Sequence, residues 1–374
     1  MSTLKTTNLQ HASAASPAIV LASDGSATAQ LSSLNGGALS GARNRIINGD
    51  MRIDQRNAGA SASLTSSQTY FLDRWFAVED TDGTMTIQQS STAPTGFQNS
   101  AILTTGTADA SLGSTQLAYV AQKPEGFNVA DFDWGTANAK TVTLSFWVRS
   151  SLTGTFGGAI SNSAFNRSYP FTYSVSAANT WEQKSVVIAG DTSGTWPKTN
   201  GIGMQIFWGL GVGSTYSGTA GSWAGTGYIS ATGATSVIGT AGATFYITGV
   251  QLEAGSVATP FERRSFGQEL ALCQRYFQPV GVGAYGRSNS TTSVEMTAKY
   301  NVAMRATPTI TFGGFSGAVT TLDQFGVGSI TASAVTSSFG NQNGGHLVFT
   351  VSGATNGADC ASIRGDLASA SAEL

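Results

Sequence analysis

The sequence predicts a mainly β protein: an antiparallel jelly-roll sandwich with one short linking helix, a smaller carboxy-terminal β domain and a small amino-terminal β-hairpin. Three observations support this prediction. The 374 residues include 46 glycines and only 11% charged residues, a composition typical of sheets joined by many turns. Short alternating segments are separated by Gly, Asn, Asp and Ser. Hydrophobic residues make up 41% of the chain, enough to bury a core without disulfides. We therefore expect four regions, 1–43, 44–262, 263–278 and 279–374.

The leader, residues 1–43, is rich in Ala, Ser and Thr and nearly free of aromatic residues, so it cannot bury a core of its own. Apolar stretches at 18–21 and 27–34 flank a Ser-Asp-Gly turn signal, which predicts a hairpin. Because an isolated hairpin is marginal in water, we expect it to pair with copies of itself or to dock on another protein. A leader without structure of its own is the alternative. The residues expected to anchor it are Ile19, Leu21, Leu31, Leu34, Arg43 and Arg45.

The body that follows has the pattern of a two-sheet sandwich. In the segment 141–149, Val142, Leu144, Phe146 and Val148 share one face, whereas Trp147 shares the other face with Thr and Ser. A segment of this kind is typical of a strand with one buried face. The number of such segments suits a jelly roll. The other strands are expected at 84–89, 101–104, 116–122, 169–175, 184–189, 203–208 and 244–252.

One helix is expected after the sandwich. Ser265 is a suitable N-cap with Gln268 three residues later, and the pattern continues to Phe277, before Pro279. Its apolar stripe should pack against a domain or against sister helices. The final β-rich unit is expected to contain strands at 293–302, 309–312, 328–337, 346–351 and 361–374. No repeat of fixed period is found, which argues against a β-helix or solenoid.

Reactive side chains are sparse. His11 and His346, the two histidines, lie in different regions, which excludes multi-histidine zinc sites. The two cysteines, Cys273 and Cys360, are interpreted as buried apolar residues. The acidic clusters lie beside turn-forming residues, where carboxylates commonly accept bonds from turn amides. We therefore expect no enzyme, no catalytic residue and no cofactor. The acidic residues considered as catalytic pairs are Glu79, Asp80, Asp82, Asp131 and Asp133.

Charge and hydropathy exclude two further classes of partner. A net charge of −2 gives no electrostatic footprint for nucleic acid or anionic lipid. No run approaches the roughly 20 apolar residues that a membrane span requires, and the amino terminus has no secretion signal.

Near the start of the body, four arginines lie close to Asp50 and Asp54, which predicts ion pairing along a hairpin or docking to an acidic partner. Those arginines are Arg43, Arg45, Arg52 and Arg56.

Carbohydrate binding is the activity for which the chain has suitable side chains, because it requires aromatic faces for sugar rings and a few polar groups for hydroxyls. The strand pattern places Trp147 on a polar face that could be open. The other aromatic candidates lie in polar, glycine-rich loops. Each ring taken singly could instead cap the sandwich or fill a subunit interface. The candidate ligand-binding residues are Trp147, Trp134, Trp196, Tyr216, Trp223 and Tyr228.

Several segments of the sequence resemble those of tailed-phage virion proteins. The segments NRIINGDMRIDQR, YFLDRW, LSFWVRSS and FYITGVQLEAGSVATPFERRS resemble phage jelly-roll modules related to carbohydrate-binding modules. The leader at 4–36 is similar to the head of cyanophage and marine-phage appendage proteins. FGQELALCQRYF, VAMRATPTITF and SASAEL are similar to the carboxy-terminal unit that accompanies these modules.

The resemblance implies a homotrimeric tail fibre or virion appendage that is assembled in the host cytoplasm. Its leader would bind other virion proteins and its sandwich a host-surface polysaccharide. The alternatives are a structural neck, collar or head fibre without receptor binding, and a glycan depolymerase. Related jelly rolls often hold calcium, and Asp50 would be its first ligand here. Because Thr248 and Gly249 stand where relatives carry acids, we otherwise expect no metal.

Overall fold

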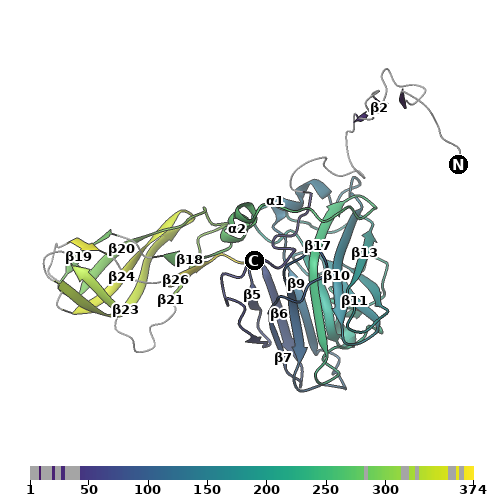
Figure 1. Cartoon of the computed structure of the whole chain (residues 1–374), viewed down its shortest axis with the longest axis horizontal. Helices are drawn as coiled ribbons and strands as arrows, with labels where there is room; N and C mark the ends of the chain where they lie inside the picture. Colours follow the sequence, from purple (N-terminus) through teal and green to yellow (C-terminus); the bar gives the residue numbers. More distant parts are fainter. Residues whose placement is uncertain are drawn as a thin grey trace.

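The computed structural model describes residues 8–9, 19–21, 27–29, 43–281, 285–312, 320–324, 328–352, 359–361 and 366–374. The fold is mainly β and antiparallel, as the sequence predicts. The carboxy-terminal unit projects from one side of the sandwich, and the C-terminus returns to the junction between them (Figure 1).

The sandwich consists of two antiparallel six-stranded sheets. The first, called here the β10 sheet, has the order β13-β10-β17-β8-β7-β4, with bounds Glu182–Ile188, Val142–Ser150, Thr244–Ala254, Ser100–Thr105, Met85–Ser90 and Ala62–Ser63. The second, the β14 sheet, has the order β12-β11-β14-β9-β6-β5, with bounds Ser168–Val175, Gly154–Ser161, Gln205–Val212, Leu117–Gln122, Trp75–Asp80 and Thr69–Leu72. The chain crosses repeatedly between the two sheets, as in a jelly roll, although β5–β6, β7–β8 and β11–β12 pair within one sheet.

The core lies between the two sheets. The apolar face of β10 is fully buried, which confirms the predicted alternation. Phe146 from this strand meets Trp208 of β14 edge to face, with ring centres 5.6 Å apart. Trp208 in turn contacts Trp75 of β6 at 5.7 Å. These large rings from both sheets fill the interior, and each removes much apolar area from water.

Short elements connect the strands. The helix α1 (Gly126–Val129) runs into the 3-10 turn η1 (Ala130–Phe132). A second 3-10 turn, η2 (Ser214–Tyr216), opens a long connection that contains the parallel pair β15 (Ser217–Gly218) and β16 (Ser230–Ala231). None of these short elements was predicted from the sequence.

Helix α2 spans Phe266–Gln274, and the Ser265 side chain accepts a hydrogen bond from the Gln268 N–H, so the predicted N-cap is confirmed. The helix ends earlier than predicted, because Phe277 begins strand β18 and pairs with Ser371. Cys273 is fully buried in a small cluster beside the sandwich. The stripe therefore packs against this chain's own sandwich.

The carboxy-terminal unit contains a three-stranded sheet and a closed six-stranded barrel. The sheet has the order β18-β26-β21, with bounds Phe277–Gly281, Asp366–Ser371 and Thr309–Phe312. The barrel has the order β19-β20-β24-β23-β22-β25, with bounds Tyr285–Ser290, Ser293–Lys299, Gly344–Ser352, Gly328–Asn341, Thr320–Gln324 and Asp359–Ala361. The predicted smaller β domain is thus a closed barrel on a three-stranded base.

The leader strands β1 (Asn8–Leu9), β2 (Ile19–Leu21) and β3 (Ala27–Ala29) form a small antiparallel sheet. Strands β2 and β3 are the predicted hairpin, with Ile19 opposite Ala29. Ile19 and Leu21 both belong to β2, whereas Leu31 and Leu34 lie outside the described residues. Among the helices of the described residues, none is long and apolar enough to span a membrane.

The end of the chain is held at the junction by charged side chains. The Glu373 carboxylate forms ion pairs with Arg56 at 2.5 Å and with Arg74. Arg305 donates to the Ala372 carbonyl at 2.9 Å. Arg56 and Arg74 fasten the last residues to the sandwich, and Arg305 ties them to the carboxy-terminal unit.

Candidate functional site

The outer face of the β10 sheet is only partly covered. At one end of the face, the Thr143 hydroxyl donates a hydrogen bond to the Gly255 carbonyl at 2.8 Å. Next to it, Glu253 accepts from the Thr259 hydroxyl at 2.6 Å. The chain after β17 therefore lies over this end and buries Thr143 and Ser145.

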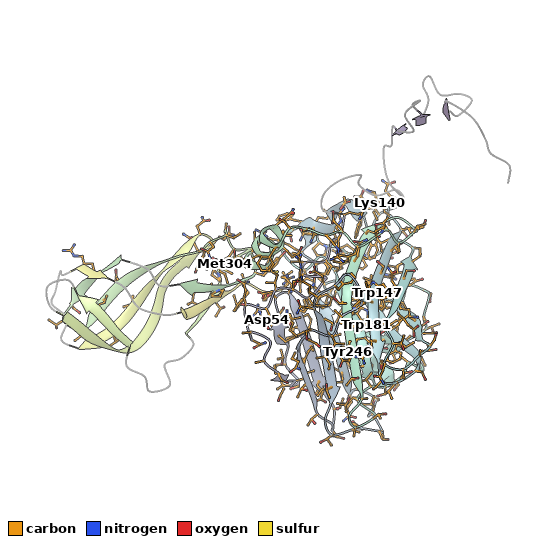
Figure 2. The ribbon with its side chains drawn as sticks, in the orientation of Figure 1. Asp54, Lys140, Trp147, Trp181, Tyr246 and Met304 are labelled. Atoms are coloured by element: carbon orange, nitrogen blue, oxygen red, sulfur yellow. The ribbon has the colours of Figure 1, made fainter. Side chains whose placement is uncertain are left out.

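The other half of the face carries half-buried aromatic side chains. Trp147 of β10 lies opposite Thr248 of β17, and Arg149 lies opposite Tyr246. Trp181 precedes β13 and meets the Tyr246 ring at 6.0 Å between centres, with the planes at 71°. Figure 2 shows Trp147, Trp181 and Tyr246 close together over β10 and β17.

A bulge at Gly249 extends this aromatic surface. The register between β10 and β17 shifts between Ser145 and Trp147, and Gly249 has a φ of 60°, where glycine is favoured. A Cβ at this position would lie 2.7 Å from the Phe97 ring and 2.9 Å from the Trp147 ring. The absence of a side chain at Gly249 therefore allows the two rings to approach the sheet side by side.

Phe97 continues the row by packing edge to face on Phe261, with ring centres 5.2 Å apart. The Arg263 guanidinium lies 4.6 Å from the centre of the Phe97 ring. At the opposite end, the Arg149 guanidinium lies 4.8 Å from the centre of the Tyr246 ring. We call this row of rings the aromatic strip; it consists of Trp181, Tyr246, Trp147, Phe97 and Phe261.

Three of the predicted ligand-binding residues meet elsewhere. Trp134, Trp196 and Trp223 pack edge to face on one another, with ring centres 4.7 to 5.6 Å apart. Trp134 and Trp196 are only 3% and 8% exposed, and their indole N–H groups donate to backbone carbonyls. The three tryptophans close one edge of the core, so the faces of Trp134 and Trp196 are not open for stacking.

The two predicted tyrosines, Tyr216 and Tyr228, belong to the connection that follows β14. This connection also contains Ile229, which packs on Phe207 and Phe76 and so crosses the outer face of the β14 sheet. Tyr216 lies at the end of this layer, and the Tyr228 ring lies against Gly218. This second face is thus largely filled by the chain's own residues, and neither tyrosine joins the aromatic strip.

Sequence reasoning selected Trp147 from the strip but missed the other four rings. The alternation in 244–252 contained a usable signal, because it places Tyr246 on the outer face with Thr248. Phe97 and Phe261 lie outside the strands, so periodicity could not place them.

The calcium candidate Asp50 has another partner. Its carboxylate is 3% exposed and pairs with Arg52 at 2.5 Å. Burial raises the pKa of the Asp50 carboxyl, and Arg52 offsets part of that rise. No group of three or more His, Cys, Asp or Glu side chains suited to a metal occurs within the described part of the chain.

The acidic residues considered for catalysis are also engaged singly. Asp131 pairs with Arg45 at 2.8 Å, and Asp133 pairs with Lys198 at 2.7 Å. Glu79 accepts from the Thr81 N–H at 2.9 Å. These contacts are typical of structural carboxylates in turns and loops.

The predicted anchoring cations Arg43 and Arg45 belong to the sandwich. The Arg43 N–H donates to the Glu262 carboxylate at 3.2 Å, and its side chain donates to the Pro260 carbonyl at 2.9 Å. Arg45 pairs with Asp131 as described above. Both arginines thus fix the start of the body; their role in anchoring stays a prediction.

No protein-family model and no curated protein matches this chain. Among solved structures it is similar to the enzymatically active domain of tailspike protein 4 from bacteriophage CBA120, with 12% identity and a TM-score of 0.30; the match covers 57% of this chain and only 21% of that one. It is similar to a putative sugar binding protein from Bacteroides thetaiotaomicron, with 12% identity, a TM-score of 0.33, and 56% and 99% of the two chains covered. It is also similar to the family 11 carbohydrate-binding module from Clostridium thermocellum in complex with a β-1,3-1,4-mixed-linked tetrasaccharide, with 10% identity, a TM-score of 0.27, and 54% and 100% covered.

Proposed function

We propose that this chain is a glycan-binding protein and that the aromatic strip is its binding face. The observation that carries the proposal is the position of the strip, which is half-exposed on the uncovered half of the β10 sheet. Sugar rings stack on aromatic faces, and hydroxyls need hydrogen-bonding groups beside them. Gln183, opposite Trp147 on β13, is exposed and offers such a group.

We further propose that the protein is a trimeric virion appendage of a tailed phage, joined to other virion proteins through residues 1–43. The support is the sequence resemblance of the leader, of the sandwich segments and of the carboxy-terminal unit. The leader strands are two or three residues long, and so small a sheet gains stability by association. Three linked copies of a weak glycan site would raise avidity without any new contact.

The test is binding of the purified full chain to a glycan array and to whole bacterial cells. A variant carrying Trp147→Ala and Trp181→Ala removes two rings of the strip. Phe127→Ala is the matched control, because Phe127 is 60% exposed but belongs to α1. The expected result is saturable binding that the double variant loses and the control keeps, with both variants folded at the assay temperature.

Two outcomes would contradict the proposal. A protein that binds neither glycan nor cells but adheres to isolated virion parts would be a structural decoration. A glycan that is cleaved on incubation would indicate a depolymerase. Light scattering of the same sample gives the mass in solution, for which the expected value is that of a trimer.

A further inference from the structure

We propose that the glycan bound by the aromatic strip is anionic and that Arg149 holds its acidic group. This inference rests on the proposed function, because it concerns the ligand of the same face. The acidic group is a carboxylate or a sulfate ester on a sugar ring, since both match the planar fork of an arginine.

The first step is the orientation of Arg149. Its Nε donates to the Asn179 carbonyl at 2.9 Å, and its guanidinium lies over the Tyr246 ring. Trp181 meets the same ring from the β13 side. The Arg149 side chain is therefore held by one hydrogen bond at Nε and by one ring against a face of its planar group, so the terminal nitrogens of the fork need less further ordering to bind an anion.

The second step is the charge of the face. Arg149 and Arg263 lie at opposite ends of the strip, and within the described residues neither forms an ion pair. Other arginines do pair with carboxylates of this chain: Arg43, Arg45, Arg52, Arg56, Arg74, Arg167, Arg264 and Arg275. Arg149 and Arg263 thus lack the carboxylate partner that these eight arginines have, as do Arg287 and Arg305 among the described arginines; Arg305 is engaged instead by the carbonyls of Ala372, Asn200 and Glu373.

The third step concerns the partners of the neighbouring carboxylates. Glu182, next to Trp181 in the chain, accepts from the Ser176 and Ala177 N–H groups and pairs with Lys184 at 2.6 Å. Glu253 on β17 is buried and bonded to Thr259. Since these carboxylates are engaged away from Arg149, an incoming anion would supply the charge that the strip lacks.

The experiment compares oligogalacturonate, its neutral methyl ester and a sulfated galactan of similar length, titrated into the full chain, and adds an array of anionic and neutral glycans. The expected result is at least about tenfold tighter binding of an anionic glycan than of its neutral counterpart, weakened by salt. Arg149→Gln should abolish that preference, and Arg149→Lys should retain part of it. Arg287→Gln, which removes an exposed arginine of the barrel, should leave it unchanged.

The outcomes separate the two proposals. Binding of neutral glycans that depends on Trp147 but not on Arg149 would overturn the anionic ligand and leave glycan binding in place. Equal affinity for oligogalacturonate, its methyl ester and the sulfated galactan would likewise overturn the anionic ligand and leave glycan binding in place. Binding of no glycan, anionic or neutral, would overturn both. Preference for the uronate or for the sulfated galactan identifies the acidic group.

Discussion

Glu373 neutralises a buried arginine at the junction of the sandwich and the carboxy-terminal unit, and its replacement should be costly. Its side chain is 8% exposed and pairs with Arg74, whose side chain is 1% exposed, and with Arg56, whose side chain is 12% exposed. Arg74 also donates to the Lys123 carbonyl at 2.5 Å, and its guanidinium lies 3.7 Å from the centre of the Tyr276 ring. Glu373→Gln keeps the shape of the side chain but leaves a cation in the interior without its anion.

The magnitude follows from these contacts. Breaking a buried ion pair by removing one partner costs about 3–5 kcal/mol. Because the Lys123 carbonyl and the Tyr276 ring remain, we expect the lower end, about 3 kcal/mol, which lowers the melting temperature by about 6–12 °C in a unit of this size. Differential scanning calorimetry of the full chain measures this change.

The control is Asp133→Asn, which breaks an ion pair with Lys198 whose side chains are 41% and 43% exposed. Asp133 has a φ of 54°, a conformation that Asn tolerates well. We expect no measurable change, because exposed pairs contribute little. If Glu373→Gln lowers the melting temperature no more than this control, the ion pair does not stabilise the junction.

Three further predictions concern other parts of the sandwich. Gly249→Ala should destabilise by about 1–2 kcal/mol because of its positive φ and should weaken glycan binding by displacing Trp147; unchanged binding would contradict the role of the bulge. Trp134→Ala should cost about 3–5 kcal/mol in urea unfolding, whereas the half-exposed Trp147→Ala should cost far less. Burial raises the pKa of the Asp73 carboxyl to about 6, so the folded chain binds this proton more tightly than the unfolded chain. The contribution of this proton to the free energy of unfolding is present below about pH 4 and is lost as the pH rises through about 6. The melting temperature of the wild type relative to Asp73→Asn should therefore fall over that range. A difference that stays constant with pH would refute the raised pKa of Asp73.

Strands with one buried and one polar face were the easiest to predict from the sequence, although β14, which is buried on both faces, was predicted in part at 203–208. Strand β10 has one buried and one polar face, and its pattern identified both its core face and the outward position of Trp147. Strand β6 was missed because Trp75 through Glu79 are all buried, which removes the alternation. Strand β11 was missed because glycines occupy its outer and inner faces alike.

Long-range pairing explains the other differences. The N-cap of α2 is a local signal, so Ser265 was predicted correctly. The end of α2 depends on Phe277 pairing with Ser371, which is far away in the sequence. No local pattern contains that information.

The candidate site was predicted only where strand periodicity applied. The loops that hold Trp134 and Trp196 are polar and glycine-rich, which suggested exposed rings, but these loops fold inward over the core. Trp181 and Tyr246 come together only through the register of β13, β10 and β17. The bulge at Gly249 that brings Phe97 to Trp147 has no sequence signature beyond the glycine itself.

The most direct measurement of the central claim is calorimetric titration of the tightest array glycan into three proteins: the wild type, the Trp147→Ala, Trp181→Ala double variant and the Phe127→Ala control. We predict saturable binding by the wild type and the control, and a loss of at least about tenfold in affinity for the double variant while it remains folded at the assay temperature. Equal affinity of all three folded proteins would show that the aromatic strip does not bind the glycan.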